Sequence, residues 1–422
     1  ECYTTGGSYF TEDATQLLAT FSYNNTTTSL SYVSSTSTTF GTTQLTKNAV
    51  EAYYVLQKTN DFFFNAYGRN GIDGAGGPAA VTTHGYNFVT AATSYSRNYV
   101  NAYWDGTMMV YGDGDGVNAS SLTALDIGGH ELAHGVTEYE ANLTYSGESG
   151  HLNEATSDVF GAMVERSVLG ESTDTWLVGE DAWTPGTSGD ALRYMNDPAD
   201  DGYSYDYYTS SIGSVDVHYG SGVPNLVFYL MSEGGTHPRG KSTVSVTAIG
   251  ADDAADIWYL ALTNYMTSST NFSAARTAML SAAQSLYGST TSAQYKAVQD
   301  AWAAVGVGTS SSGGGGSSSS CATTTTYTGS LSKSRASSYA PSSSGSSVTG
   351  TYQTATLTGP SSTSTDFDLY LQKKSGSSWS SVASSTKSGS SESISYTGTS
   401  GTYRVQIYSY KGSGSYSMTW CR

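Results

Sequence analysis

The spacing of apolar residues changes along the chain and predicts three structural stretches. Up to about residue 120, Tyr, Thr, Ser, Val and Phe alternate with frequent Gly and Asn, which is typical of strands and turns. Residues 46–68 interrupt this pattern with apolar residues at helical spacing. Helical spacing then prevails from Leu122 to Val305, and the clearest predicted helices are residues 153–169, 223–231, 250–266, 273–287 and 292–305.

The third stretch follows the Gly/Ser tract 308–320, which cannot bury apolar surface and is predicted to be a flexible tether. Beyond it, Phe367, Leu369 and Leu371 alternate with polar residues, as do residues 403–407. Short alternating runs between Gly/Ser turns favour a β-sandwich over residues 321–422. We therefore expect an α+β domain over 1–307, with a β-rich lobe (about 1–121) and an α-helical lobe (122–307), then the tether and the sandwich.

Cysteine positions add a constraint on the last segment. Cys321 and Cys421 stand at its two ends, so a disulfide that closes it is the economical interpretation, and it implies an oxidising compartment. Two unrelated thiols are the alternative. Cys2 has no evident partner.

Charge and composition exclude some functions. The chain has a net charge of −17, and residues 321–422 carry +5, which leaves −22 on the rest. Such an acidic main part argues against nucleic acid as a partner and suits bound calcium. The chain has no apolar run of 18 residues, so we expect no membrane span. We expect an exported protein whose signal peptide has been removed.

The segment His130-Glu131-Leu132-Ala133-His134 is the strongest chemical signal. Histidines at i and i+4 project from one helix face and can bind one zinc ion, with Glu131 within reach of a water on the metal. By itself the pattern could also belong to a surface helix.

A catalytic zinc needs a third protein ligand. Glu154 and Asp158 follow twenty and twenty-four residues after His134, one turn apart on a predicted helix that begins near Asn153. One carboxylate can bind zinc while the other accepts a hydrogen bond from a bound imidazole.

These residues resemble those of the thermolysin-like (M4) zinc metallopeptidases. HELAH followed by NEATSD carries the resemblance. Four further motifs occur in the family's order: NAYW at 101–104, MVYGDGDG at 109–116, LRYM at 192–195 with DP at 197–198, and DVHYGSGV at 216–223. Together they span roughly residues 40–305.

The resemblance implies a role for each site residue. His130, His134 and Glu154 would bind zinc, with Asp158 and Asn153 supporting the ligands, and Glu131 would act as general base on the zinc-activated water. His218 and Tyr145 would stabilise the oxyanion, and Asp216 would orient His218. The implied substrate contacts are Asn101, Ala102 and Arg193, with Ile127 and Leu192 lining an apolar pocket that selects a hydrophobic P1′ residue.

The resemblance also implies structural calcium, through Asp126, Glu165, Asp174, Glu180 and the Leu177 carbonyl. Ala162 stands where the family often has a glutamate ligand, and the spacing from Glu165 to Trp176 is about two residues longer than usual. We therefore expect one calcium ion rather than a double site.

The last segment resembles a bacterial pre-peptidase C-terminal (PPC) domain, through Thr326–Leu331 and Asp366–Leu371. Two roles stay open for it. Its charge of +5 and aromatics taken as exposed favour binding to insoluble protein or polysaccharide; these aromatics are Tyr370, Trp379, Tyr408, Tyr410 and Trp420. The alternative is a removable spacer or secretion aid.

The resulting prediction is a secreted, extracellular, monomeric zinc endopeptidase that acts on proteins or peptides. The rival from another class is a zinc-binding adhesin that has lost catalysis. Loss of Glu131 or His218 would have indicated the adhesin, and both residues are present.

Overall fold

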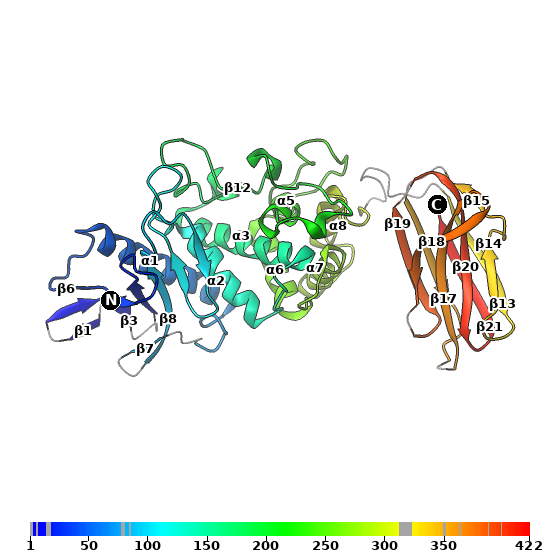
Figure 1. The fold of residues 1–422 in the computed structure, drawn as a ribbon, viewed down its shortest axis with the longest axis horizontal. Coiled ribbons are helices and arrows are strands. Elements are labelled where there is room, and N and C mark those ends of the chain that lie inside the picture. Colours follow the sequence, from blue (N-terminus) through cyan, green and yellow to red (C-terminus); the bar gives the residue numbers. More distant parts are fainter. Residues whose placement is uncertain are drawn as a thin grey trace. The chain divides into compact units, whose positions relative to one another are not determined.

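A computed structural model of the chain describes residues 3–5, 7–13, 18–76, 81–83, 86–311, 323–348, 352–362, 364–386, 388–397 and 399–422. The chain divides into two compact units, Glu1–Ser311 and Ser312–Arg422, which Figure 1 shows and which are described separately below. From residue 312 on, the Gly/Ser tether lies outside the described residues, as does Cys321. Within the described residues, no helix is both long and apolar enough to span a bilayer.

The first lobe of unit 1 is built on a twisted mixed sheet with strand order β3-β4-β8-β10-β9, on which β5 pairs with β4 and β7 with β8. Strands β1, β2 and β6 form a separate small sheet. The strand bounds are β1 Tyr3–Thr5, β2 Ser8–Phe10, β3 Glu12–Asp13, β4 Leu18–Ser22, β5 Ser31–Tyr32, β6 Ser34–Ser35, β7 Val81–Thr83, β8 Tyr86–Thr93, β9 Ala102–Trp104 and β10 Met109–Tyr111.

The helix predicted over residues 46–68 is α1 (Gln44–Tyr67), which packs on β4 and β8. Its N-terminus is capped by Thr43, whose hydroxyl accepts from the Thr46 backbone N–H. Gly68 ends the helix at φ 66°, a left-handed conformation that glycine adopts without a Cβ penalty.

The second lobe is helical, with small strands and single-turn helices in its connections. Its elements are α2 Leu125–Tyr139, α3 Gly147–Leu169, η1 Asp174–Trp176, β11 Leu177–Val178, β12 Arg193–Tyr194, η2 Pro198–Asp201, η3 Ile212–Ser214, α4 Val217–Gly220, α5 Gly222–Glu233, α6 Ala251–Asn264, α7 Phe272–Tyr287 and α8 Ala293–Ala304. Fully buried Trp258, Trp302, Phe228 and Phe272 fill the space between these helices.

The sequence placed the start of α3 too late. The helix begins at Gly147 rather than near Asn153, so Glu154 lies two turns inside it. Glycines at 147 and 150 weaken the helical signal at the sequence level. Gly150 is needed there, because a Cβ would lie 2.5 Å from Cγ1 of Val217 on a facing segment.

Helices α2 and α3 pack unusually closely. A Cβ on Gly129 would lie 2.9 Å from Cα of Gly161, and a Cβ on Gly161 would lie 2.4 Å from the backbone oxygen of Asp126. Glycine on both helices therefore permits backbone contact that any side chain would prevent.

Unit 2 consists of two antiparallel sheets, with strand orders β13-β21-β16-β19 and β14-β20-β17-β18, and β15 pairs with β20. Side chains from both sheets form one core, including Leu357, Met418, Leu369 and Ile407. The strand bounds are β13 Thr324–Leu331, β14 Ser337–Ala340, β15 Ser346–Val348, β16 Tyr352–Thr358, β17 Asp366–Ser375, β18 Ser378–Ser385, β19 Ser391–Thr397, β20 Gly401–Lys411 and β21 Gly414–Cys421.

Of the five aromatic residues that the sequence suggested as exposed, only Tyr410 is; Tyr370, Trp379 and Tyr408 are half-buried, and Trp420 is buried. Trp420 is 0% exposed because it shares the inner face of β21 with Tyr416 and Met418. Its indole N–H donates to Gln353 Oε1 at 3.2 Å. Trp420 therefore belongs to the core of the sandwich and not to a binding surface.

The close packing of α2 on α3 predicts an unusual cost for a small substitution. Gly161→Ala should destabilise unit 1 by about 1–3 kcal/mol, because the added methyl forces the helices apart. In an open helix the same change would stabilise, so the sign of the effect tests the contact. Urea unfolding should show the loss. Gly186→Ala is the control, since a Cβ at that position would have no other atom within 4 Å; equal stability of the two variants would contradict the prediction.

Candidate active site

A cleft of about 1400 Å³ crosses unit 1 and is lined by residues of both lobes. The first lobe contributes Asn101–Trp104 on and beside β9, and the second contributes side chains of α2, α3 and the segment around His218. Of the site residues inferred from sequence, the cleft brings together His130, His134, Glu131, Glu154, Tyr145, Asn153, Asp216, His218, Asn101, Ala102, Arg193, Ile127 and Leu192.

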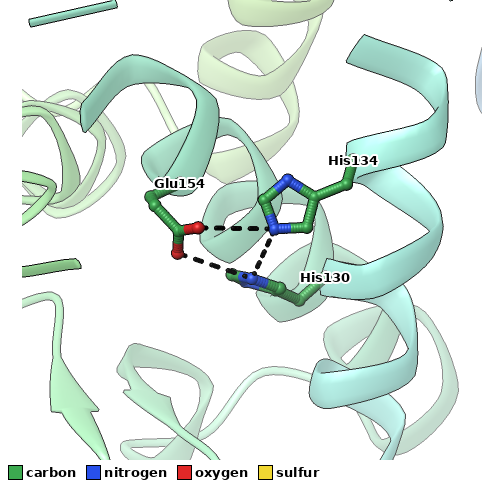
Figure 2. Close-up of side chains that lie close together, drawn as sticks. All are labelled: His130, His134 and Glu154. Atoms are coloured by element: carbon green, nitrogen blue, oxygen red, sulfur yellow. Dashed lines mark hydrogen bonds and ion pairs between the residues drawn. The ribbon is translucent and has the colours of Figure 1, made fainter. Parts of the chain in front are cut away.

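The two histidines of α2 and Glu154 of α3 converge on one point (Figure 2). The Nε2 atoms of His130 and His134 lie 3.0 Å apart. Glu154 Oε2 lies 3.6 Å from His130 Nε2, and Glu154 Oε1 lies 3.5 Å from His134 Nε2. The i, i+4 spacing puts both rings on the helix face turned toward α3.

Hydrogen bonds at the far side of each ring fix which nitrogen is free. His130 Nδ1 donates to Asp158 Oδ1 at 2.8 Å. His134 Nδ1 lies 2.7 Å from Asn153 Oδ1, and the Asn153 amide is oriented by its own donation to the Leu143 carbonyl. Each Nδ1 therefore carries a proton, which leaves the Nε2 lone pairs pointing at one another.

This arrangement fits a bound cation. Two nitrogen lone pairs and a carboxylate converge, and Glu154 Oε2 is buried with no hydrogen-bond partner among the described residues. Such a group of electron-rich atoms repels itself unless a positive charge lies among them. Two imidazoles and one carboxylate are a donor set that suits Zn²⁺.

The pKa of His130 shows the same demand for positive charge, whereas that of His134 does not. Burial by itself would lower the pKa of His130. The hydrogen bond to Asp158 and the nearby carboxylates outweigh this effect and raise the pKa to about 9. Burial lowers the pKa of His134 to about 4. Burial alone would raise the pKa of Glu154, but the charges of His134 and His130 lower it below its ordinary value.

Glu131 lies beside these ligands without being one of them. Its side chain is buried and lines the same cleft. Burial raises the pKa of its carboxyl to about 7, although the charge of His130 and a hydrogen bond from the Trp104 backbone act in the opposite direction. A carboxylate with a pKa near neutral can both accept and return a proton.

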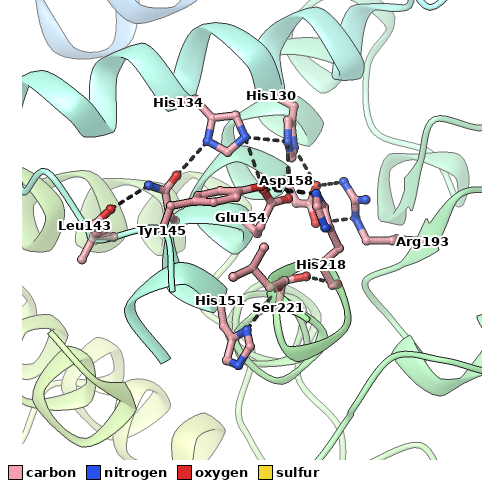
Figure 3. A network of polar contacts seen from close by, with 12 residues as sticks. His130, His134, Leu143, Tyr145, His151, Glu154, Asp158, Arg193, His218 and Ser221 are labelled. Atoms are coloured by element: carbon pink, nitrogen blue, oxygen red, sulfur yellow. Dashed lines mark hydrogen bonds and ion pairs between the residues drawn. The ribbon is translucent and has the colours of Figure 1, made fainter. Parts of the chain in front are cut away.

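Tyr145 and His218 lie next to Glu154 (Figure 3). The Tyr145 hydroxyl donates to Glu154 Oε1 and lies 3.3 Å from His218 Nε2. Asp216 Oδ1 accepts from His218 Nδ1 at 2.8 Å and from the His218 backbone N–H at 3.0 Å, and these bonds lower the pKa of Asp216. The side chains of Tyr145 and His218 are about half exposed, and both line the cleft.

Arg193 has a contact that the sequence did not reveal. Its guanidinium donates from Nε and Nη2 to the two Asp158 oxygens, at 2.9 and 2.6 Å. Asn225 also donates to Asp158 Oδ2, at 2.8 Å. Despite burial, Arg193 and His130 hold the pKa of Asp158 well below its usual range. Asn225 lies two residues after the DVHYGSGV motif (216–223) and 67 residues from Asp158, so no motif indicated that the two side chains are in contact.

A second cluster of acidic residues lies at the opposite part of the α2–α3 contact. Carboxylate oxygens of Asp126, Glu165 and Glu180 lie within 4.8 Å of one another. Burial and mutual repulsion raise their pKa values, to about 6, 9 and 8. Glu165 Oε2 and Glu180 Oε2 are buried with no hydrogen-bond partner among the described residues.

The other calcium candidates from sequence are placed less centrally. Asp174 lies within electrostatic range of Glu180 but outside the cluster of three. Leu177 pairs with Tyr194 on the small β11–β12 sheet, and Ala162 is buried in the core. Asp181, which no motif indicated, carries a charge that raises the pKa of all three clustered carboxyls.

Fold and site together define a two-lobed α+β protein with a His–His–Glu metal-type centre between its lobes. Residues 1–138 match the thermolysin metallopeptidase catalytic domain, and residues 141–307 match the thermolysin metallopeptidase α-helical domain. Residues 344–409 match the bacterial pre-peptidase C-terminal domain. The chain belongs to the thermolysin metallopeptidase family, as the resemblance of its motifs predicted.

Known relatives agree with this assignment. The chain is 46% identical to bacillolysin of Bacillus cereus and 43% identical to thermolysin of Alicyclobacillus acidocaldarius, each over 263 residues, 61% of this chain. The solved structure of the precursor of protealysin, a metalloproteinase from Serratia proteamaculans, matches with 30% identity and a TM-score of 0.53, covering 68% of this chain and 87% of that one. The chain spans 44% and 45% of the two curated relatives.

Proposed function

We propose that this protein is a secreted zinc-dependent endopeptidase. The observation that carries the proposal is the convergence of the His130, His134 and Glu154 ligand atoms in a cleft that also holds Glu131, His218 and Tyr145. Ligands, a base and oxyanion donors are the parts that hydrolysis of a peptide bond requires.

Zinc held by His130, His134 and Glu154 would supply a Lewis acid that polarises the scissile carbonyl and makes water more acidic. Glu131 takes a proton from the attacking water as the new C–O bond forms. It then delivers that proton to the amide nitrogen as the C–N bond breaks, so one water is consumed for each bond cut. A base with a pKa of about 7 suits both steps.

The remaining residues bind and orient. Tyr145 and His218 line the cleft, and they are our candidates for stabilising the negative charge that develops on the carbonyl oxygen. Asp216 fixes the His218 ring by accepting from Nδ1. Asn101, the Ala102 carbonyl and Arg193 are our candidates for substrate backbone contacts.

We propose that substrates are proteins or peptides with a large apolar residue at P1′. Ile127 and Leu192 line the cleft together with apolar Val178 and Leu122. Burial of one apolar side chain in such a pocket contributes about 1.5–3 kcal/mol, enough to set a preference at that position.

Replacement of the proposed base tests catalysis directly. Glu131→Gln should lower kcat for a peptide substrate about 100- to 10,000-fold while zinc stays bound, because the amide can no longer take the proton. Fluorescence-quenched peptides with P1′ varied from Leu to Asp measure rate and preference together, with metal analysis in parallel.

Glu138→Gln is the matched control. Glu138 also lines the cleft from α2, but its carboxylate accepts from the Trp104 indole, 2.9 Å away, so the variant should keep wild-type kcat. A zinc-loaded wild-type protein without peptidase activity would favour the non-catalytic adhesin instead.

We further propose that the Asp126–Glu165–Glu180 cluster binds one structural calcium ion. Its three carboxylates, of which Asp126 and Glu165 are buried, offer the hard oxygen ligands that Ca²⁺ prefers. Asp174, the Leu177 carbonyl and Asp181 are candidates for completing the shell. The ion would offset the mutual repulsion that otherwise raises these pKa values.

Calcium should therefore raise thermal stability. After metal removal, zinc with calcium at 100 times its Kd should raise Tm by about 5–10 °C over zinc alone. The Glu131→Gln background avoids self-digestion during heating. Glu165→Gln should lose most of the shift, whereas Glu171→Gln, whose carboxylate pairs with Arg166 at the protein surface, should keep it. Full stability with zinc alone would refute the calcium site.

For unit 2 we propose an accessory role outside catalysis, either attachment to insoluble substrate or assistance in secretion, with Cys321 and Cys421 closing the domain. Among its aromatics, Tyr410 is 65% exposed, and Arg404 lies over the rings of Tyr339 and Trp379 at 4.1 and 4.2 Å. Exposed Tyr410 and the half-buried aromatic pair beside Arg404 are the features that support attachment. We expect the protein to act as a monomer.

Attachment is tested by comparing the full chain with a form that ends at residue 311. Pull-down on insoluble collagen, chitin and cellulose should retain the full chain on at least one solid, and truncation should reduce retention at least about tenfold. Equal retention of the two forms on all three would leave the secretion role.

A further inference from the structure

A buried histidine on α3 lies beneath the segment that carries Asp216 and His218. His151 is 0% exposed and stands one turn before Glu154 on the same helix. Its Nε2 lies 2.8 Å from the Ile212 carbonyl oxygen and its Nδ1 lies 3.2 Å from the Val217 carbonyl oxygen. The ring therefore contacts the backbone at two points, one on either side of Asp216.

The same ring is held in close packing from above. A Cβ on Gly220 would lie 2.3–2.4 Å from three atoms of the His151 ring. The adjacent Gly150 is packed equally closely, since its Cβ would meet Val217 Cγ1 at 2.5 Å. Two glycines, one on each side of the contact, thus allow the ring to lie directly against the backbone of α4.

The two contacts are chemically specific. Both partners are backbone carbonyl oxygens, which only accept hydrogen bonds. A neutral imidazole carries one N–H and so donates one of these two bonds, of which the Nε2 contact to Ile212 in η3 is the shorter, while its other edge lies against the backbone of α4. No aliphatic side chain of the same volume can make either bond.

We propose that His151 is a positioning residue, which ties the segment 212–220 to helix α3 and so sets the distance between His218 and Glu154. The inference rests on the proposed function, because it assigns His151 a role through His218. Glu154 and His151 share one rigid helix, and His218 Nε2 lies 3.5 Å from Glu154 Oε1. A shift of the segment by about 1 Å would misplace the oxyanion donor and can cost about 100-fold in rate.

The first test replaces the ring with an apolar side chain. His151→Leu should lower kcat about 10- to 100-fold, with KM within about threefold and zinc content unchanged, because oxyanion stabilisation is lost while substrate binding is kept. Phe160→Leu is the matched control, since it removes a fully buried ring from the same helix, one that packs on Phe63. The control should lower Tm but keep kcat. Equal kcat in the two variants would overturn the proposal.

A double-mutant cycle tests the contact itself and does not depend on the leucine variant folding. Gly220→Ala alone should lower kcat, because its methyl displaces the His151 ring. In a His151→Ala background the ring is gone, so Gly220→Ala should cost less than about threefold more. Additive effects of the two substitutions would show that the ring does not hold this segment and would overturn the proposal.

The outcomes also separate this inference from the proposed function. A wild-type protein without zinc-dependent peptidase activity defeats the proposed function. Wild-type activity that depends on Glu131 but is unaffected by His151→Leu defeats only the positioning role.

Discussion

The close contact of α2 with α3 is the constraint on which the rest of unit 1 depends. Gly129 and Gly161 let the two helix backbones come closer than any side chain between them would allow. Polar side chains of each helix then lie next to those of the other. At one part of the contact, His130 and His134 of α2 meet Glu154 of α3. At another part, Asp126 of α2 meets Glu165 of α3. One packing arrangement therefore produces both clusters of ligand-type atoms.

That contact carries a considerable electrostatic cost. Glu131, Glu154, Asp158, Asp126 and Glu165 are all buried on two adjacent helices. The structure offsets part of the cost with Arg193, which makes two hydrogen bonds to Asp158. Of the others, Glu154, Asp126 and Glu165 gather in the two clusters that could hold a metal ion, as expected if bound cations supply the missing charge.

Much of the fold could be predicted from the chain because the relevant signals are local. Helical periodicity located α1 and α5–α8 within a few residues, and the i, i+4 histidines required a common helix face. The alternation around Leu369 and Val405 likewise predicted the inward faces of β17 and β20.

The remaining features depend on contacts between distant residues. In the sequence Gly150 resembles a helix breaker, and only the structure shows that it makes room for Val217. Trp420 resembles a surface aromatic, but the pairing of the strands places it in the core. The bond from Arg193 to Asp158 and the position of His151 under Gly220 join segments 35 and 69 residues apart. No local pattern encodes such pairs.

The two histidine ligands are not equivalent. The Nδ1 atom of His130 lies against an anionic carboxylate, whereas that of His134 lies against a neutral amide. A carboxylate acceptor makes the opposite nitrogen a stronger electron donor. A metal ion in this site would thus be held by two imidazoles of unequal donor strength, with His130 the stronger. Arg193, which itself lines the cleft, shares the Asp158 carboxylate with His130, so a change at Arg193 would also change the donor strength of that imidazole.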